Sequence, residues 1–267
     1  MNWTAVGGGV SGSLGPSFVS ALAVQGSTVY VGGSFAAAGS TPALNVAKWD
    51  GTNWIALGTG VNATVHSLAA VPTGVYAGGN FNQAGGLAAH YVALWDGTRW
   101  SPLGSGLTSD RTPGIAALAI NGDDLYVGGL EFSGAGGVLS TNIVRWTGQE
   151  WCALGQGITG PFGGSVNALC ASGSELFVGG YFDTAGGQPA NGLAIWHIPH
   201  VLKIRPEGEA AVVSWPATGT NFMLEAKGGV ASADWSEVAQ PFIVTNDECV
   251  VTDPLSASKR IYRLRRR

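Results

Sequence analysis

Hydrophobic and polar positions alternate over short runs through the first 199 residues of the chain. The first four runs are residues 19–24, 29–33, 46–49 and 54–58. Each is bounded by Gly-rich or polar turns, a pattern typical of half-buried β-strands and not of helices. Asp50-Gly51 between the third and fourth runs suits a tight hairpin, because both residues tolerate positive φ. The pattern therefore predicts four antiparallel strands in sequence.

This set of runs recurs along the chain. The second run ends in a Gly-Gly pair in every copy, and the first glycines of these pairs are Gly32, Gly78, Gly128 and Gly179, at intervals of 46, 50 and 51 residues. The third run ends in a tryptophan in every copy, namely Trp49, Trp95, Trp146 and Trp196. A period near 50 residues with four strands per period predicts the blades of a β-propeller.

The two ends of the repeat array complement each other. Residues 3–10 match the fourth run of a copy, as in residues 54–61, whereas the last copy stops after its third run at Trp196. The single run at the start, the twelve runs of the three complete copies and the three runs of the last copy make sixteen, or four blades of four strands. We therefore expect a four-bladed β-propeller in which residues 3–10 pair with residues 193–198 and close the last blade. A clipped segment of a larger propeller fits the same arithmetic.

Composition changes near His200. Residues 1–199 carry 4 basic and 9 acidic side chains, whereas residues 200–267 carry 9 basic and 8 acidic ones. Alternating runs in the later part, such as residues 211–215, 221–225 and 261–264, predict a small β-sandwich. The expected domains are thus a β-propeller over residues 1–199 and a sandwich over residues 200–267.

The repeats have the form Gly-Gly-x-Phe-x-x-Ala-Gly followed by Ala-x-Trp-Asp-Gly-x-x-Trp, with Gly32, Phe35, Ala38, Trp49 and Trp54 in the first copy. They resemble β-propeller repeats of bacterial surface proteins, and are similar to fungal cortical polarity-marker and kelch-type repeats. The tail, with Val213-Ser214-Trp215-Pro216 and Tyr262-Arg263-Leu264-Arg265, resembles a fibronectin-III-like module that lacks its last strand. These resemblances imply an extracellular or cell-envelope location and carry no established catalytic site. Residues 1–4 do not resemble a signal peptide, so a fragment or cytoplasmic residence is the alternative.

Charge and motif content exclude several classes of function. Charged residues make up 11% of the chain and the net charge is −4, which favours neither a nucleic-acid partner nor an acidic tail. No apolar run approaches the 18 residues of a membrane span, so none is expected. His197 and His200 flank Pro199 without a Cys or carboxylate cluster, and the cysteines lack metal-ligand spacing, so we expect neither metal nor cofactor. Catalytic motifs are likewise missing, which favours a non-enzymatic protein.

The loop between the second and third strands is the candidate binding surface. It covers residues 34–45 in the first copy, is longer than a hairpin requires, and must leave the same face of the propeller in every copy. Its polar side chains differ between copies, which favours recognition on a rigid scaffold. The candidate ligand-binding residues are Asn82, Gln83, His90, Tyr91, Asn142, Asp183, Gln188 and Asn191. The alternative is that the Ala-Gly-Gly turn of this loop serves only the edge of the blade.

The sequence therefore predicts an extracellular or surface recognition or structural module that binds a protein or polysaccharide partner through one propeller face. The expected state is a monomer, with a dimeric ring as the alternative. The competing function is a propeller enzyme that acts on glycans with acids drawn from several loops. A pocket holding two carboxylates within about 10 Å would favour that enzyme.

Overall fold

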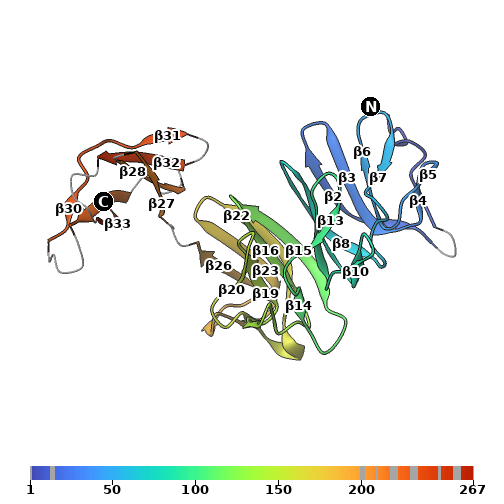
Figure 1. Cartoon of the computed structure of the whole chain (residues 1–267). Coiled ribbons are helices and arrows are strands. Elements are labelled where there is room, and N and C mark those ends of the chain that lie inside the picture. Colours follow the sequence, from blue (N-terminus) through green and yellow to red (C-terminus); the bar gives the residue numbers. More distant parts are fainter. Residues whose placement is uncertain are drawn as a thin grey trace. The chain divides into compact units, whose positions relative to one another are not determined.

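The computed structural model describes residues 2–12, 16–198, 202–208, 210–216, 222–228, 234–245, 248–254 and 260–266. Over these residues the chain is all-β, with antiparallel sheets, one 3-10 turn and no α-helix (Figure 1). Its contacts divide it into two compact units, one of Met1–Ala171 with Leu176–Trp196 and the other of Ser172–Glu175 with His197–Arg267. We call them the repeat unit and the C-terminal unit. The predicted domain boundary after residue 199 lies outside the described residues.

The repeats form four sheets, which we call sheets 1 to 4. In sheets 1 to 3, four strands follow one another as an antiparallel meander, as the alternating pattern predicts. Sheet 4 has three strands. The strands are β2 (Phe18–Gln25), β3 (Thr28–Ser34), β6 (Val46–Trp49) and β7 (Trp54–Ala56) in sheet 1; β8 (Val65–Val71), β9 (Gly74–Gly79), β12 (Val92–Trp95) and β13 (Trp100–Pro102) in sheet 2; β15 (Gly114–Asn121), β16 (Asp124–Leu130), β19 (Ile143–Trp146) and β20 (Trp151–Ala153) in sheet 3; and β22 (Ser165–Ser172), β23 (Glu175–Tyr181) and β26 (Leu193–His197) in sheet 4.

The repeated Gly-Gly pair has a steric cause. In sheet 2 the register of β8 shifts between Val65 and Ser67, opposite this pair on β9. A Cβ atom on Gly79 would lie 2.1 Å from the carbonyl oxygen of Thr64, and one on Gly78 would lie 2.7 Å from Cγ2 of Ile115 in sheet 3. The second glycine therefore admits the bulged first strand. The first glycine admits the next sheet.

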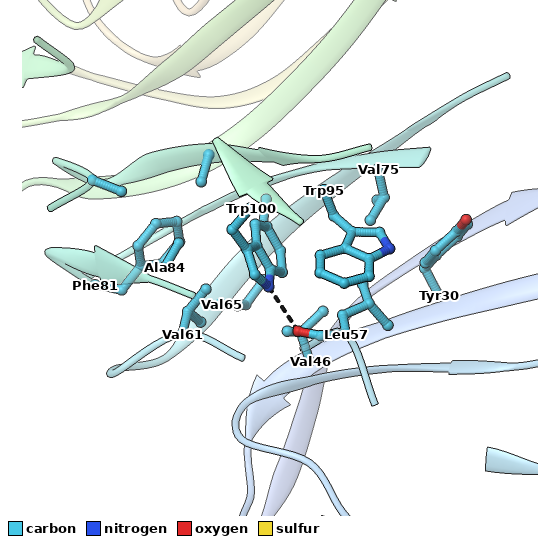
Figure 2. Close-up of a cluster of buried hydrophobic side chains, with 13 residues drawn as sticks. Tyr30, Val46, Leu57, Val61, Val65, Val75, Phe81, Ala84, Trp95 and Trp100 are labelled. Atoms are coloured by element: carbon cyan, nitrogen blue, oxygen red, sulfur yellow. Dashed lines mark hydrogen bonds between the residues drawn. The ribbon is translucent and has the colours of Figure 1, made fainter. Parts of the chain in front are cut away.

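Paired tryptophans hold consecutive sheets together. Figure 2 shows Trp100 of sheet 2, whose Nε1 donates a hydrogen bond of 2.7 Å to the carbonyl oxygen of Leu57 at the end of sheet 1. The ring centroids of Trp95 and Trp100 lie 5.7 Å apart in a buried cluster with Phe81. Trp151 of sheet 3 repeats the bond to Leu103 at 2.9 Å. Trp100 and Trp151 thus each have a fixed acceptor in the preceding copy, whereas Nε1 of buried Trp95 has no hydrogen-bond partner within the described residues.

Each loop between second and third strands folds into a short hairpin. The hairpins are β4 (Ala37–Ala38) with β5 (Thr41–Pro42), β10 (Gln83–Ala84) with β11 (Leu87–Ala88), β17 (Gly134–Ala135) with β18 (Val138–Leu139), and β24 (Thr184–Ala185) with β25 (Gln188–Pro189). The segment before each sheet adds to the hairpin, as β1 (Val10–Ser11), β14 (Leu107–Thr108) and β21 (Ile158–Thr159). In the second copy this contact is a single bridge between Val61 and Ala84.

The first residues of the chain pair with sheet 1. Val10 pairs with Ala38, and the carbonyl oxygen of Gly7 accepts a hydrogen bond of 3.1 Å from Trp54 Nε1. Residues 7–11 thus occupy on sheet 1 the place that residues 58–62 occupy on sheet 2. The predicted pairing of residues 3–10 with residues 193–198 is not among the strand pairs of the described residues, so the ring closure stays a prediction. Trp3 is fully exposed.

The C-terminal unit is a small two-sheet sandwich. One sheet orders β27 (Lys203–Glu207), β28 (Ala210–Pro216), β32 (Glu248–Pro254) and β31 (Ile243–Thr245), and the other orders β30 (Ser236–Glu237), β29 (Phe222–Lys227) and β33 (Ile261–Arg266). Val213 and Trp215 of the first sheet share a core with Leu224 of the second. Tyr262 donates a 2.8 Å hydrogen bond to Asp253. Burial and this bond raise the pKa of Tyr262 to about 12.

Replacing Trp100 by Phe should lower the free energy of unfolding by about 1–3 kcal/mol, because the buried carbonyl of Leu57 loses its donor and the smaller ring leaves space. Leu139→Ala is the control, since Leu139 is 80% exposed and its truncation should leave the free energy nearly unchanged. Urea unfolding of both variants, followed by circular dichroism, measures the difference. Equal midpoints would contradict the proposed anchoring role of Trp100.

Replacing Gly79 by Ala should lower the free energy of unfolding by about 2–3 kcal/mol, because the new methyl group meets backbone and not a side chain that could rotate away. At Gly228 a Cβ atom meets nothing within 4 Å, so Gly228→Ala is the control. Thermal unfolding of the two variants provides the measurement. A Gly79 variant as stable as the unmodified chain would show that the bulge does not require glycine.

Candidate functional site

The candidate site lies at one end of the repeat sheets. Each long loop joins the second strand of its sheet to the third, so all four loops leave their sheets at the same end. We call this the loop end; it comprises residues 34–45, 80–91, 130–142 and 181–192. The hairpin turns that follow Trp49, Trp95 and Trp146 lie at the opposite end of each sheet, because every strand reverses the direction of the chain.

The last residue of each loop has a left-handed backbone conformation. These residues are Asn45, Tyr91, Asn142 and Gly192, with φ of 63°, 73°, 58° and 76°. In each copy its carbonyl oxygen accepts a 3.0–3.1 Å hydrogen bond from the second glycine of the Gly-Gly pair. Asn and Gly adopt this conformation most readily, whereas tyrosine rarely does. The sequence reasoning missed this shared position, although the Asn and Gly residues there were a signal.

Asn142 is a buried structural residue in the loop of sheet 3. Its side chain is only 2% exposed. Its Nδ2 donates hydrogen bonds of 2.8 Å to the Gly163 carbonyl and 3.4 Å to the Ile158 carbonyl. Asn45 repeats the arrangement with a 2.8 Å bond to the carbonyl of Val61. Although Asn142 was predicted to bind a ligand, its amide ties the loop to the segment leading to sheet 4 and does not face solvent.

The loop of sheet 2 carries the predicted residues Asn82, Gln83, His90 and Tyr91. The first three are exposed and Tyr91 is half-buried. Asn62, which the sequence reasoning did not select, fixes this loop. Its Nδ2 donates to Asn82 Oδ1 at 2.6 Å, and its Oδ1 accepts from the backbone amides of Asn82 and Gln83 at 3.0 Å. The backbone here is therefore held in place while the Gln83 and His90 side chains face outward.

The loop of sheet 4 carries Asp183, Gln188 and Asn191, and all three are exposed. The Asp183 amide donates a 3.2 Å hydrogen bond to the carbonyl of Thr159, which joins the loop to β21. Gln188 lines a cavity of about 200 Å³ together with apolar residues such as Leu154 and Trp196, whereas Asp183 and Asn191 do not line it. The structure therefore brings these three residues onto one loop without gathering them in one pocket.

A charged pair lies on the loop of sheet 3. The Nη1 atom of Arg111 is 3.4 Å from Oε1 of Glu131, and Ser109 Oγ donates to the Glu131 carbonyl. Glu131 has φ of 61°, again left-handed. Both charged side chains are largely exposed, so the pair contributes little stability. Arg111 was not among the predicted residues, because it precedes β15 and reaches the loop only through the fold.

The opposite end of the sheets has structural turns. In sheet 2, Oδ1 of Asp96 accepts hydrogen bonds of 2.9 Å from the backbone amides of Thr98 and Arg99, and one of 2.7 Å from the Thr98 hydroxyl. These hydrogen bonds, the Thr98 hydroxyl first, lower the pKa of Asp96 to about 2. Asp50 makes the same turn in sheet 1. The Asp-Gly pairs thus shape hairpins, as the sequence predicts.

Two cavities lie among the described residues, and neither gathers carboxylates. The cavity of about 200 Å³ has no carboxylate in its lining, and a second one of about 250 Å³, in the C-terminal unit, has Glu237 alone. His197 Nδ1 lies 3.7 Å from Glu175 Oε1, and His200 lies outside the described residues. Across the described ranges, no group of three His, Cys, Asp or Glu side chains could hold a metal ion. No helix in the same part of the chain is long and apolar enough to cross a membrane.

Comparisons with known proteins give weak likenesses. No protein-family model and no curated protein matches the chain. Among solved structures, the computationally designed Ika4 protein aligns with a TM-score of 0.42 at 18% identity, over 71% of this chain and 97% of its own. The designed Ika8 protein gives 0.43 at 15% identity, over 93% and 71%. YCF48 bound to D1 peptide gives 0.32 at 11%, over 94% and 77%. TM-scores below 0.5 do not assign a shared fold or a function.

Replacing Asn142 by Ala should lower the free energy of unfolding by about 2–4 kcal/mol, because buried carbonyls lose their donor and alanine disfavours positive φ. Asn142→Gly keeps the backbone conformation and should recover about 1 kcal/mol of that loss. His90→Ala, at an exposed side chain, is the control and should change the free energy by less than about 0.5 kcal/mol. Chemical denaturation distinguishes the three, and an unaltered Asn142→Ala variant would contradict the structural role.

Proposed function

We propose that this protein is a non-enzymatic recognition or structural module of the cell surface, which binds a protein or glycan partner through the loop end of its repeat sheets. We further propose that sheets 1 to 4 are four consecutive blades of a β-propeller, and that residues 3–5 supply the fourth strand of a last blade. The C-terminal sandwich fits the fibronectin-III-like module that the sequence resembles.

One observation carries the proposal of binding: the loop backbones are fixed while their outer side chains are free. Buried Asn45 and Asn142 and the backbone bonds to the Gly-Gly pairs hold each loop on its sheet. Gln83, His90 and Asp183 are exposed on the same end of these sheets. A rigid frame that presents different polar groups at equivalent positions loses little conformational entropy on binding.

The chemistry of the loop end suits an uncharged or weakly charged polar partner. Its exposed polar groups are amides and an imidazole, which both donate and accept hydrogen bonds, the Asp183 carboxylate, and the balanced pair of Arg111 and Glu131. Exposed Leu87, Leu139 and Tyr181 lie among them and add apolar area. Such groups match the hydroxyls of a glycan or the backbone of a protein loop. The alternative of a glycan-cleaving enzyme finds no support in the two cavities, because neither brings two carboxylates together.

The test compares two variants that are matched in the number of substitutions. The loop-end variant combines Gln83→Ala, His90→Ala, Asp183→Ala and Asn191→Ala. The control combines Thr52→Ala, Asn53→Ala, Arg99→Ala and Glu150→Ala, all exposed on the Trp-flanked hairpins. Affinity electrophoresis against neutral and uronic-acid polysaccharides, and biolayer interferometry against surface-protein ectodomains, measure binding. The loop-end variant should weaken binding at least about tenfold, equivalent to about 1.4 kcal/mol, and the control less than about twofold.

Two outcomes would contradict this proposal. Equal weakening by both variants would place recognition away from the loop end. Cleavage of a polysaccharide by the unmodified chain, detected as new reducing ends, would favour the enzyme. Circular dichroism of each variant checks that folding is unchanged, which these exposed positions predict.

A further inference from the structure

We infer that a second copy of this chain docks head to tail on the repeat unit, with the open face of β2 in one copy covering sheet 4 of the other. In this arrangement residues 3–5 of the first copy add to β26 of the second as its fourth strand. The inference rests on the proposed blades, but it does not depend on the proposed partner binding at the loop end.

The contacts inside the chain define what such an interface requires. Val65, Ile115 and Val166, at equivalent positions on β8, β15 and β22, are completely buried. Each side chain lies over the first glycine of the preceding sheet. Cβ atoms built on Gly32, Gly78 and Gly128 would lie 2.5, 2.7 and 2.5 Å from these side chains. The same close contact thus joins sheets 1 and 2, sheets 2 and 3, and sheets 3 and 4.

Each end of the array has one half of this contact. Val19 is the equivalent of Val65 on β2, yet it is 42% exposed, and Leu22 beside it is 64% exposed. Gly179 is the equivalent glycine on β23, and a Cβ atom there would meet nothing closer than Ala168 at 3.9 Å. Sheet 1 therefore offers the side chains without a glycine surface to cover. Sheet 4 offers the glycine surface without side chains above it.

The unpaired residues 3–5 and the open edge of sheet 4 indicate the same pairing between two copies. Residues 3–5 have the sequence position of β7, but no strand of the described residues pairs with them. Sheet 4 ends at β26, where Leu193 and Ile195 are 66% and 45% exposed. An open strand edge of this kind favours the addition of another strand. By analogy with Trp49 opposite Trp54 and Ala47 opposite Ala56 in sheet 1, Trp3 should lie opposite Trp196 and Ala5 opposite Ala194.

A second copy can cover Val19 and Gly179 without changing the contacts between sheets 1 to 4. The three internal contacts are already fully buried, and they leave Val19 and Gly179 uncovered. Closure of one chain upon itself would have to change the angle at each of those close-packed interfaces. Docking of a second copy leaves these interfaces unchanged. The new contact joins two different surfaces and is therefore heterologous, so the assembly closes only when the number of blades completes a ring. Two copies give eight blades, the upper limit of the usual four to eight, whereas three would exceed it.

The decisive experiment mixes two variants of the full chain, each with one added cysteine. Both also carry Cys170→Ala and Cys152→Ser, because Cys170 is exposed and Cys152 is half-buried, and other copies have alanine and serine at these positions. Cys249 is buried and is kept. One adds Ala5→Cys and the other Ala194→Cys. In sheet 1 the counterparts of these two residues are Ala56 and Ala47, which lie opposite each other. Asp50 and Asn53 form a hydrogen-bonded pair and such pairs alternate with non-hydrogen-bonded ones, so Ala47 and Ala56 are a non-hydrogen-bonded pair. The Cα atoms of such a pair are about 4.5 Å apart, which suits a disulfide. Oxidation of the mixture should give a covalent dimer on a non-reducing gel, and oxidation of either variant alone should not.

The double variant, Ala5→Cys with Ala194→Cys in one chain, distinguishes closure by a second copy from closure by the same chain. A cross-linked monomer that runs faster than the reduced chain, with no dimer in the mixture, would overturn the inference and favour the single-chain ring that the sequence predicts. No cross-link in either sample would overturn both readings of the ring. Neither result bears on binding at the loop end, which the polysaccharide and ectodomain assays measure separately.

Sedimentation equilibrium gives an independent measurement without cysteines. The unmodified chain should have the mass of two copies at micromolar concentration. Leu22→Lys should raise the dissociation constant at least about tenfold, because it places a charge against the glycine surface of sheet 4. Leu139→Lys, at an 80% exposed position on β18, is the matched control and should leave the mass unchanged. A monomer at every concentration, or equal effects of the two lysines, would overturn the inference.

Discussion

The close approach of strands at the Gly-Gly pair is the constraint on which the repeat unit depends. The second glycine accommodates the bulged first strand of its own sheet, and the first accommodates an aliphatic side chain of the next sheet. Gly78 shows why a side chain cannot be placed there: a methyl group would lie less than 3 Å from both Ile115 and Ser67. Because these two positions carry no side chain, sheets 1 to 3 can each lie close against the next sheet. The Gly-Gly pair therefore recurs along the chain because the same packing contact recurs between neighbouring sheets.

A second set of interactions converts stacked sheets into a connected array. The segments that leave sheets 1 and 2 cross to the next copy, where the carbonyl of Leu57 or Leu103 accepts a tryptophan Nε1. The segments that leave sheets 2 and 3 pair with the next loop hairpin. Buried Asn45 and Asn142 donate to the same crossing segments. Each copy is thus fastened by the chain that precedes or follows it. This explains why residues 7–11, which precede the first copy, pair with sheet 1 and are not available for sheet 4.

Stability and the proposed recognition depend on different residues. Asn45 and Asn142, which fix the loops of sheets 1 and 3, are buried and left-handed, whereas Asn62 fixes the loop of sheet 2 from an exposed position. Residues that face outward at the loop end, such as Gln83 and Asp183, carry almost none of the packing and can differ between copies without loss of stability. The open faces of β2 and sheet 4 are different in kind, because they are apolar or glycine-rich and repeat the internal interface. The proposed partner surface and the two surfaces proposed to meet a second copy are therefore distinct parts of the repeat unit.

The sequence by itself determined the strands, the sheets and the turns of the repeats. Alternation of polarity, the Gly-Gly period and the Asp-Gly turns are local signals, and each reports a local cause: strand faces, steric clearance or positive φ. It also identified the exposed positions Asn82, Gln83, His90, Asp183, Gln188 and Asn191, because polarity in a long loop is visible in the sequence. Only the tertiary structure showed that Asn142 is buried, that Asn62 and Arg111 reach loops distant in sequence, and that residues 7–11 lie on sheet 1. Those facts depend on which segments meet across the fold, and residue type alone carries no information on a partner 20 or more positions away.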